Sequence, residues 1–228
     1  MIDISLETSL WITLLGLIGL LFAEAQDSLV LRWATKPFAS TGFLLIAVSV
    51  GALDGSLYGQ MVFAALVLSW FGDMFLIPKA KLSFLFGLIS FLSGHVGYVV
   101  AFFWGVGFDS VWGGASLLGM VPVSLFIASW LKPHATKAKM WGPVLAYIVV
   151  ITSMVVCAFG AYPISQNPLI PIGAVLFYLS DIAVARQRFV TPAVSNRMWG
   201  LPFYYGGQVI LALSIDVYAA YSLLYSLS

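Results

Sequence analysis

The stretch WFGDMFLIPK, residues 70–79, places Asp73 inside a sequence that otherwise has the composition of a membrane-spanning helix. The stretch FYLSDIAVAR, residues 177–186, does the same with Asp181. A basic residue follows each time, Lys79 after Asp73 and Arg186 after Asp181. Because ionisable side chains are costly in a bilayer, we expect both aspartates to face a bundle interior or a water-filled cavity.

The composition extends this interpretation to the whole chain. Of 228 residues, 61% are hydrophobic and 8% are charged, whereas soluble domains carry about 25% charged residues. No polar stretch is long enough for a second domain, so we expect one integral membrane domain over residues 1–228. LLFAEAQ (20–26) imitates a signal-peptidase site, but acidic rather than basic residues precede it, which favours a retained first helix. A net charge of +1 gives no indication of nucleic-acid binding.

Apolar runs separated by Gly, Pro or charge predict an all-α bundle of eight transmembrane helices. The expected spans are 6–23, 37–53, 58–77, 82–104, 111–131, 140–160, 168–185 and 199–224.

With eight spans, every basic residue falls in the loops that join helices one to two, three to four, five to six and seven to eight. The basic residues are Arg32, Lys36, Lys79, Lys81, Lys132, Lys137, Lys139, Arg186, Arg188 and Arg197. Since Lys and Arg accumulate on the cytoplasmic side, we expect both termini outside. In a bacterium the protein would lie in the inner membrane, with its site toward the cytoplasmic leaflet.

Helix geometry then gives the depth of the polar residues. Asp73 precedes Lys79 by about 9 Å of helical rise and Asp181 precedes Arg186 by about 7.5 Å, so the two carboxylates are expected at nearly equal depth. Further polar side chains are expected to form the pocket around them. These are Glu24, Lys36, His95, Tyr98, Tyr204, Tyr205 and Gln208.

Each of these residues also has a purely structural interpretation. Asp73 and Asp181 could pair with Lys36 or Arg186 or mark wet helix ends, and His95 and Gln208 could be packing or interhelical hydrogen-bonding residues. No His, Cys and Asp cluster has metal-ligand spacing, and no Gly-x-Ser-x-Gly elbow occurs. Metal hydrolase and serine lipase chemistry are therefore disfavoured, and we expect no metal or other cofactor.

Five short motifs resemble, in order and spacing, the YhhN-type lysoplasmalogenase family of polytopic membrane proteins. They are TKPF (35–38), FGDMFLIP (71–78), SGHVGY (93–98), LSDIAVARQRF (179–189) and YYGGQVILALS (204–214). The first predicted helix and the loop between helices five and six carry no such motif. Gly94 stands where an alanine-like residue is expected, a minor departure.

The resemblance implies an ether hydrolase that cleaves the vinyl ether bond of lysoplasmalogen to a fatty aldehyde and a glycerophospho-base. It also implies that the two aspartate motifs, here Asp73 and Asp181, form the active site. The expected partners are a lysophospholipid, water and membrane lipids.

Vinyl ether chemistry suits two carboxyl groups. The bond resists bases but yields to protonation at its β-carbon, which produces an oxocarbenium ion that water then captures. One aspartate would donate the proton and the other, ionised, would stabilise the cation. The sequence leaves open which of the two aspartates donates the proton. Tyr204, Tyr205 and Gln208 could orient water or the ether oxygen, and Lys36 could hold the lipid phosphate.

Three other functions fit the same sequence. A transporter of a small amphiphile is one, because helices three and seven could be equivalent members of two internal repeats of four helices each. A non-catalytic lipid-binding protein and a hydrolase of another lysolipid are the others.

Overall fold

The computed structural model describes residues 5–216, and within this range it contains eight α-helices, two π-helical segments and no strands. The elements are α1 (Leu6–Ala25), α2 (Leu29–Ser49), α3 (Leu57–Leu76), α4 (Lys81–Val100), η1 (Ala101–Val106), α5 (Ser110–Lys137), α6 (Trp141–Ser165), α7 (Leu169–Ala185), η2 (Arg186–Val190) and α8 (Val194–Leu213). The predicted all-α class is confirmed.

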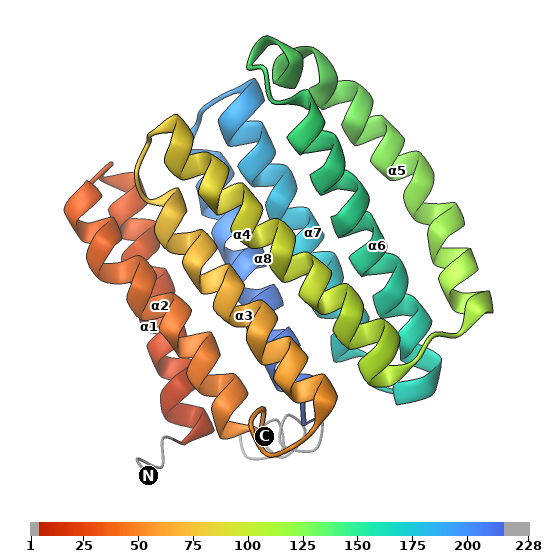
Figure 1. Cartoon of the computed structure of the whole chain (residues 1–228). Helices are drawn as coiled ribbons and strands as arrows, with labels where there is room; N and C mark the ends of the chain where they lie inside the picture. Colours follow the sequence, from red (N-terminus) through yellow and green to blue (C-terminus); the bar gives the residue numbers. More distant parts are fainter. Residues whose placement is uncertain (1–4, 217–228) are drawn as a thin grey trace.

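The helices form four consecutive hairpins. α1 packs on α2, α3 on α4, α5 on α6 and α7 on α8, and the tight connection of every hairpin lies at the same end of the bundle, at the top of Figure 1. We call this the basic end, because all ten Lys and Arg residues lie in these connections or within about two helical turns of them.

Six of the described helical segments are long and apolar enough to cross a membrane. They are α1, α3, α4 with η1, α5, α6, and α7 with η2. The protein is therefore a multi-pass membrane protein. α2 and α8 are not among these six, and they carry polar residues, Arg32 and Lys36 in α2 and Gln208 in α8. The count of eight spans and the location of the termini remain predictions.

The start of α2 differs most from expectation. It begins at Leu29, not 37, where the Ser28 side chain accepts a hydrogen bond from the Leu31 N–H and caps the helix. Arg32, Lys36 and Pro37 therefore lie within the helix, and assigning them to a loop or a helix end was wrong. Their charges suggested a loop, but both basic side chains are buried in ion pairs.

Other helix ends also differ from the expected positions. α5 was expected over 111–131 and extends to Lys137, with Pro133 inside it, and α6 was expected to end at 160 and extends to Ser165. α8 begins at Val194 rather than 199 and ends at Leu213, while 217–224 of the expected span lie outside the described residues. α4 and α7 each continue as a π-helical segment.

Glycines bring two helix pairs close together. A methyl group at Gly16 of α1 would lie 2.6 Å from Ala39 Cα of α2, and one at Gly207 of α8 would lie 3.1 Å from the Gly173 carbonyl oxygen of α7. Larger residues at these contacts would force the helices apart. This packing holds α2 and α8, which carry Lys36 and Gln208, within the bundle.

α5 is the most peripheral of the candidate spans. Only 11% of its apolar window is buried, compared with 61% for α6, on which it packs. Figure 1 shows it at one edge of the bundle. Most of its surface therefore faces outward.

Candidate active site

A cavity of about 710 Å³ lies at the basic end of the bundle. Asp73 from α3 and Asp181 from α7 both line it, together with Lys36 from α2 and Tyr204 from α8. Its mouth lies near Asp27 and Lys79, whose side chains are exposed. Many of its apolar lining residues come from α4, α5 and α6: Phe84, Leu88, Phe91, Ile127, Leu131, Val144, Ile148 and Ile151.

Asp73 is held by three donors from two other helices. Lys36 Nζ lies 3.0 Å from Oδ1, while the Ser40 and Tyr204 hydroxyls each donate to Oδ2 at 2.6 Å. Lys36 and Ser40 are one helical turn apart on α2 and so share a face. Three donors, one of them cationic, suit the ionised carboxylate.

A chain of hydrogen bonds continues from this carboxylate into α8 and α4. The Tyr205 hydroxyl lies 3.0 Å from Ser40 Oγ. Gln208 Nε2 donates a hydrogen bond to the Tyr204 hydroxyl oxygen at 3.3 Å, and Gln208 Oε1 accepts one from the Tyr98 hydroxyl at 2.7 Å. Buried polar groups need such partners, and the chain fixes the Tyr204 ring beside the cavity.

Asp181 has a different environment. Its Oδ2 accepts a hydrogen bond from the Tyr147 hydroxyl of α6 at 2.8 Å and lies 3.0 Å from Nε2 of His95 in α4. Its Oδ1 has no hydrogen-bond partner among residues 5–216, and the side chain lines the cavity with 16% of its surface exposed. One oxygen is thus anchored, and the other is free to meet a ligand.

His95 indicates where the protons of this cluster lie. Its side chain is fully buried, and Nδ1 has no hydrogen-bond partner in the described part of the chain. A proton on Nδ1 would be a buried donor without an acceptor, which is costly. The tautomer with its proton on Nε2 avoids this cost and can donate to Asp181 Oδ2. A proton carried by Asp181 itself would then sit on Oδ1, facing the cavity.

Aromatic rings separate the two aspartate clusters inside the protein. The ring centroid of Phe177 lies 4.5 Å from that of His95 and 5.4 Å from that of Tyr204. The ring of Phe91 packs edge-on against Phe177. Among residues 5–216 the two carboxylates therefore share no hydrogen-bond network, but both line the same cavity.

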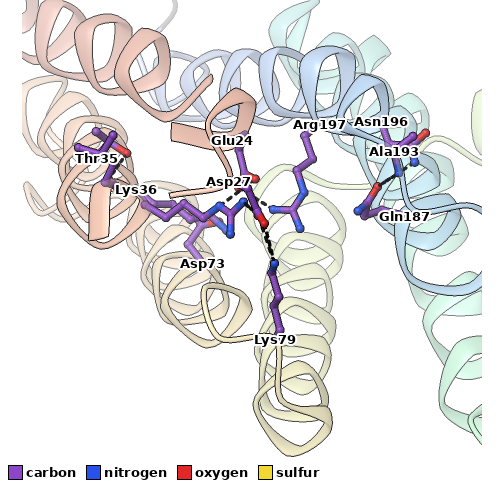
Figure 2. Close-up of polar contacts among 12 residues, drawn as sticks. Glu24, Asp27, Thr35, Lys36, Asp73, Lys79, Gln187, Ala193, Asn196 and Arg197 are labelled. Atoms are coloured by element: carbon purple, nitrogen blue, oxygen red, sulfur yellow. Dashed lines mark hydrogen bonds and ion pairs between the residues drawn. The ribbon is translucent and has the colours of Figure 1, made fainter. Parts of the chain in front are cut away.

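An ion-pair cluster surrounds the mouth. Glu24 pairs with Arg32 at 2.9 Å and with Arg197 at 2.5 Å, while Asp27 pairs with Arg32 and Lys79. Figure 2 shows Asp27, Lys79 and Arg197 converging, with Lys36 and Asp73 beside them. The hydrogen bond from Arg32, followed by that from Lys79, lowers the pKa of Asp27 below its ordinary value of 3.8.

The predicted site residues thus divide into two groups. Those that line the cavity are Glu24, Lys36, Asp73, Asp181 and Tyr204. Those that lie behind its wall and support it are His95, Tyr98, Tyr205 and Gln208, all buried.

Sequence reasoning missed three side chains that contact the acidic residues of the candidate site. Ser40 follows Lys36 by one helical turn, a spacing that would have revealed it had α2 been started at residue 29. The ion pair of Arg32 could also have been expected, because its partner Glu24 lies close by in the sequence. Tyr147 lies in an apolar run of α6 and gave no signal beyond its hydroxyl group.

Within residues 5–216, His, Cys, Asp and Glu side chains form no group of three that could hold a metal ion.

Fold and site together define a class: a helical multi-pass membrane protein with two aspartates, one buried and one half-buried, beside an amphipathic cavity at one end of the bundle. Within this class, the chain belongs to the YhhN family, whose sequence profile matches residues 31–215.

Curated relatives in this family carry the name lysoplasmalogenase. Lysoplasmalogenase TMEM86A of Bos taurus is 27% identical over 189 residues, 78% of this chain and 74% of that protein. Lysoplasmalogenase TMEM86B of Homo sapiens is 30% identical over 173 residues, 76% and 69% of the two chains. Lysoplasmalogenase of Mycobacterium bovis is 31% identical over 172 residues, 73% of this chain and 63% of that protein. No solved structure matches the chain.

Proposed function

We propose that this protein is a lysoplasmalogenase, which hydrolyses the vinyl ether bond of a lysoplasmalogen to a fatty aldehyde and a glycerophospho-base. The observation that carries the proposal is that Asp73 and Asp181, from helices far apart in sequence, line one cavity with a polar and an apolar wall. The names of the family's curated relatives support the same reaction.

In the proposed mechanism Asp181 is the acid. Its Oδ1 proton passes to the β-carbon of the vinyl ether, and the resulting carboxylate stabilises the oxocarbenium ion across the cavity. Water adds to the cation, and its proton returns to Asp181. The hemiacetal then collapses to aldehyde and alcohol. Tyr147 and His95 hold Oδ2 throughout, so that the same oxygen atom faces the substrate in each cycle.

Asp73 has a different part in this proposal. As an ionised carboxylate it holds Lys36 and Tyr204 against the cavity wall. The ammonium group of Lys36 has three N–H bonds, and those not directed at Asp73 can bind the glycerol hydroxyl or the attacking water. Asp73 therefore positions the polar wall opposite the acid.

The proposed orientation places the basic end in the cytoplasm and both termini outside. The confinement of all Lys and Arg residues to that end supports it. The substrate would then enter from the cytoplasmic leaflet, with its tail along the apolar wall of α4, α5 and α6.

The test is incubation of the purified protein in detergent with three lipids of equal chain length: a lysoplasmalogen, an ester lysophospholipid and a saturated alkyl-ether analogue. Only the lysoplasmalogen is expected to release aldehyde. In D₂O that aldehyde should carry one deuterium on the carbon next to the carbonyl, because protonation of that carbon starts the reaction. Fatty acid release from the ester, or an aldehyde without deuterium, would reject the mechanism. Uptake of intact lipid into proteoliposomes without hydrolysis would favour a transporter.

A further inference from the structure

The cationic groups at the cavity differ in whether a carboxylate compensates them. Lys36 is paired with Asp73, and the mouth cluster ties Arg32, Lys79 and Arg197 to Glu24 and Asp27. Arg188 also lines the cavity, but it forms no ion pair or hydrogen bond within residues 5–216.

The guanidinium of Arg188 is held by an aromatic ring. Its Cζ lies 4.3 Å from the centroid of Phe84 on α4, a cation–π contact that fixes the group without neutralising its charge. All of its N–H donors therefore remain available to a ligand, in a side chain that is half-buried beside the cavity. A planar cation of this kind is suited to bidentate binding of a phosphate.

The position of Arg188 relative to Asp181 matches the shape of a lysophospholipid. Arg188 lies seven residues after Asp181, at most about 10 Å along the helix axis toward the basic end. It belongs to η2, a π-helical segment of the type often found at functional sites. A long arginine side chain can reach back over part of this separation, leaving a gap that a three-carbon glycerol unit spans.

We propose that Arg188 binds the phosphate of a lysolipid headgroup at the cavity mouth and so sets the vinyl ether bond beside Asp181. This inference rests on the proposed function for the identity of the reacting bond, but not for the phosphate. The sequence had suggested Lys36 for the phosphate contact. The proposal assigns this contact to Arg188 instead, because a carboxylate already compensates the charge of Lys36.

The test measures binding separately from catalysis. Two labelled ligands of the same chain length are compared in phospholipid-free detergent: a saturated 1-O-alkyl-glycerophosphocholine, which this mechanism cannot cleave, and the 1-O-alkylglycerol that lacks the phosphate. Arg188→Gln is expected to weaken binding of the first by roughly 10- to 100-fold and to leave binding of the second unchanged. Arg188→Lys keeps the charge but not the planar group suited to bidentate binding, so its affinity for the phosphate-containing ligand should be intermediate.

The matched control is Lys137→Gln, which removes a charge from an exposed residue at the same end of the bundle, outside the cavity lining. It should change neither affinity. Equal losses for both ligands in Arg188→Gln would show that Arg188 only supports the fold through Phe84, and no loss for either would remove it from the site.

Two competitors distinguish the sources of phosphate. Inorganic phosphate or diacyl phosphatidylcholine that displaces the labelled lysolipid at equal concentration would overturn the assignment to a lysolipid headgroup. Phosphate-dependent binding without aldehyde release from lysoplasmalogen would refute the proposed reaction and leave the Arg188 site standing.

Discussion

Asp73 and Asp181 differ in how completely the protein satisfies them. The Asp73 side chain is 2% exposed and accepts from Lys36, Ser40 and Tyr204, so both of its oxygens are engaged. The Asp181 side chain is 16% exposed, with one oxygen anchored and the other facing the cavity. Two aspartates that look equivalent in sequence therefore have different surroundings, and the proposed mechanism gives them different tasks, one to hold a wall in place and the other to exchange a proton.

The strongest way to test this comparison is to remove the proton of Asp181. Asp181→Asn keeps an oxygen that can accept from Tyr147 and His95 but loses the acid, so kcat for lysoplasmalogen should fall by about 10²- to 10⁴-fold with little change in Tm. Aldehyde release and thermal unfolding in detergent measure the two effects. Asp54→Asn, an exposed residue outside the cavity lining, is the control, and wild-type turnover by Asp181→Asn would exclude it as the acid.

The matching change at Asp73 should affect the fold first. Asp73→Asn leaves the Lys36 ammonium buried without a counter-charge, which is expected to lower the free energy of unfolding by about 3–5 kcal/mol. Chemical unfolding in mild detergent measures the loss. In the double variant Lys36→Met, Asp73→Asn most of this stability should return, while activity stays low because the polar wall is gone. A single variant as stable as the wild type would contradict the buried ion pair.

A smaller effect is expected from Tyr147→Phe. The ring contact with His95, 5.2 Å between centroids, is kept, and only the hydroxyl that donates to Asp181 is lost. One hydrogen bond of about 1 kcal/mol corresponds to a loss in kcat of several-fold to about tenfold. Tyr162→Phe, farther along α6 and packed on Trp112, should leave kcat unchanged. A larger loss in the control than in Tyr147→Phe would remove Tyr147 from the site.

The smallest effect is expected at the mouth. The pKa of Asp27 is lowered in the folded protein, mainly by Arg32, so its ionised form favours folding above pH 3.8, and this contribution is lost as the pH falls through the lowered pKa. Asp27→Asn should therefore lower Tm slightly at neutral pH and flatten its decline below pH 4. Tm measured from pH 3 to pH 7 tests this, and an unchanged acid slope would mean that the pair with Arg32 adds nothing.

The sequence predicted the helical class. It also singled out Asp73 and Asp181, because a carboxylate in an apolar run is costly unless it faces a polar interior; both line the cavity, and their catalytic roles stay predictions. It failed at the start of α2, where Arg32 and Lys36 were read as solvated. Their partners lie in other helices or across a turn, and hydropathy does not record such pairing.

The pairing of His95 with Asp181 could not be predicted for a related reason. The expected depth of Asp181 was measured from Arg186, but the helix continues through η2 to Val190. Asp181 is thus nine residues from the end of its helical segment, about 13 Å, where a side chain from the second half of α4 can reach it. A π-helical extension leaves no clear mark on an apolar sequence.

The peripheral position of α5 has a consequence for substrate choice. Its Ile127 and Leu131 line the apolar wall, yet neither aspartate has a hydrogen bond or ion pair with this helix in the described chain. If the proposed function is right, substitutions or small shifts of α5 would therefore change the preferred length of the hydrocarbon tail without moving the proposed proton donor, Asp181. Selectivity and reactivity would then evolve on separate parts of the molecule.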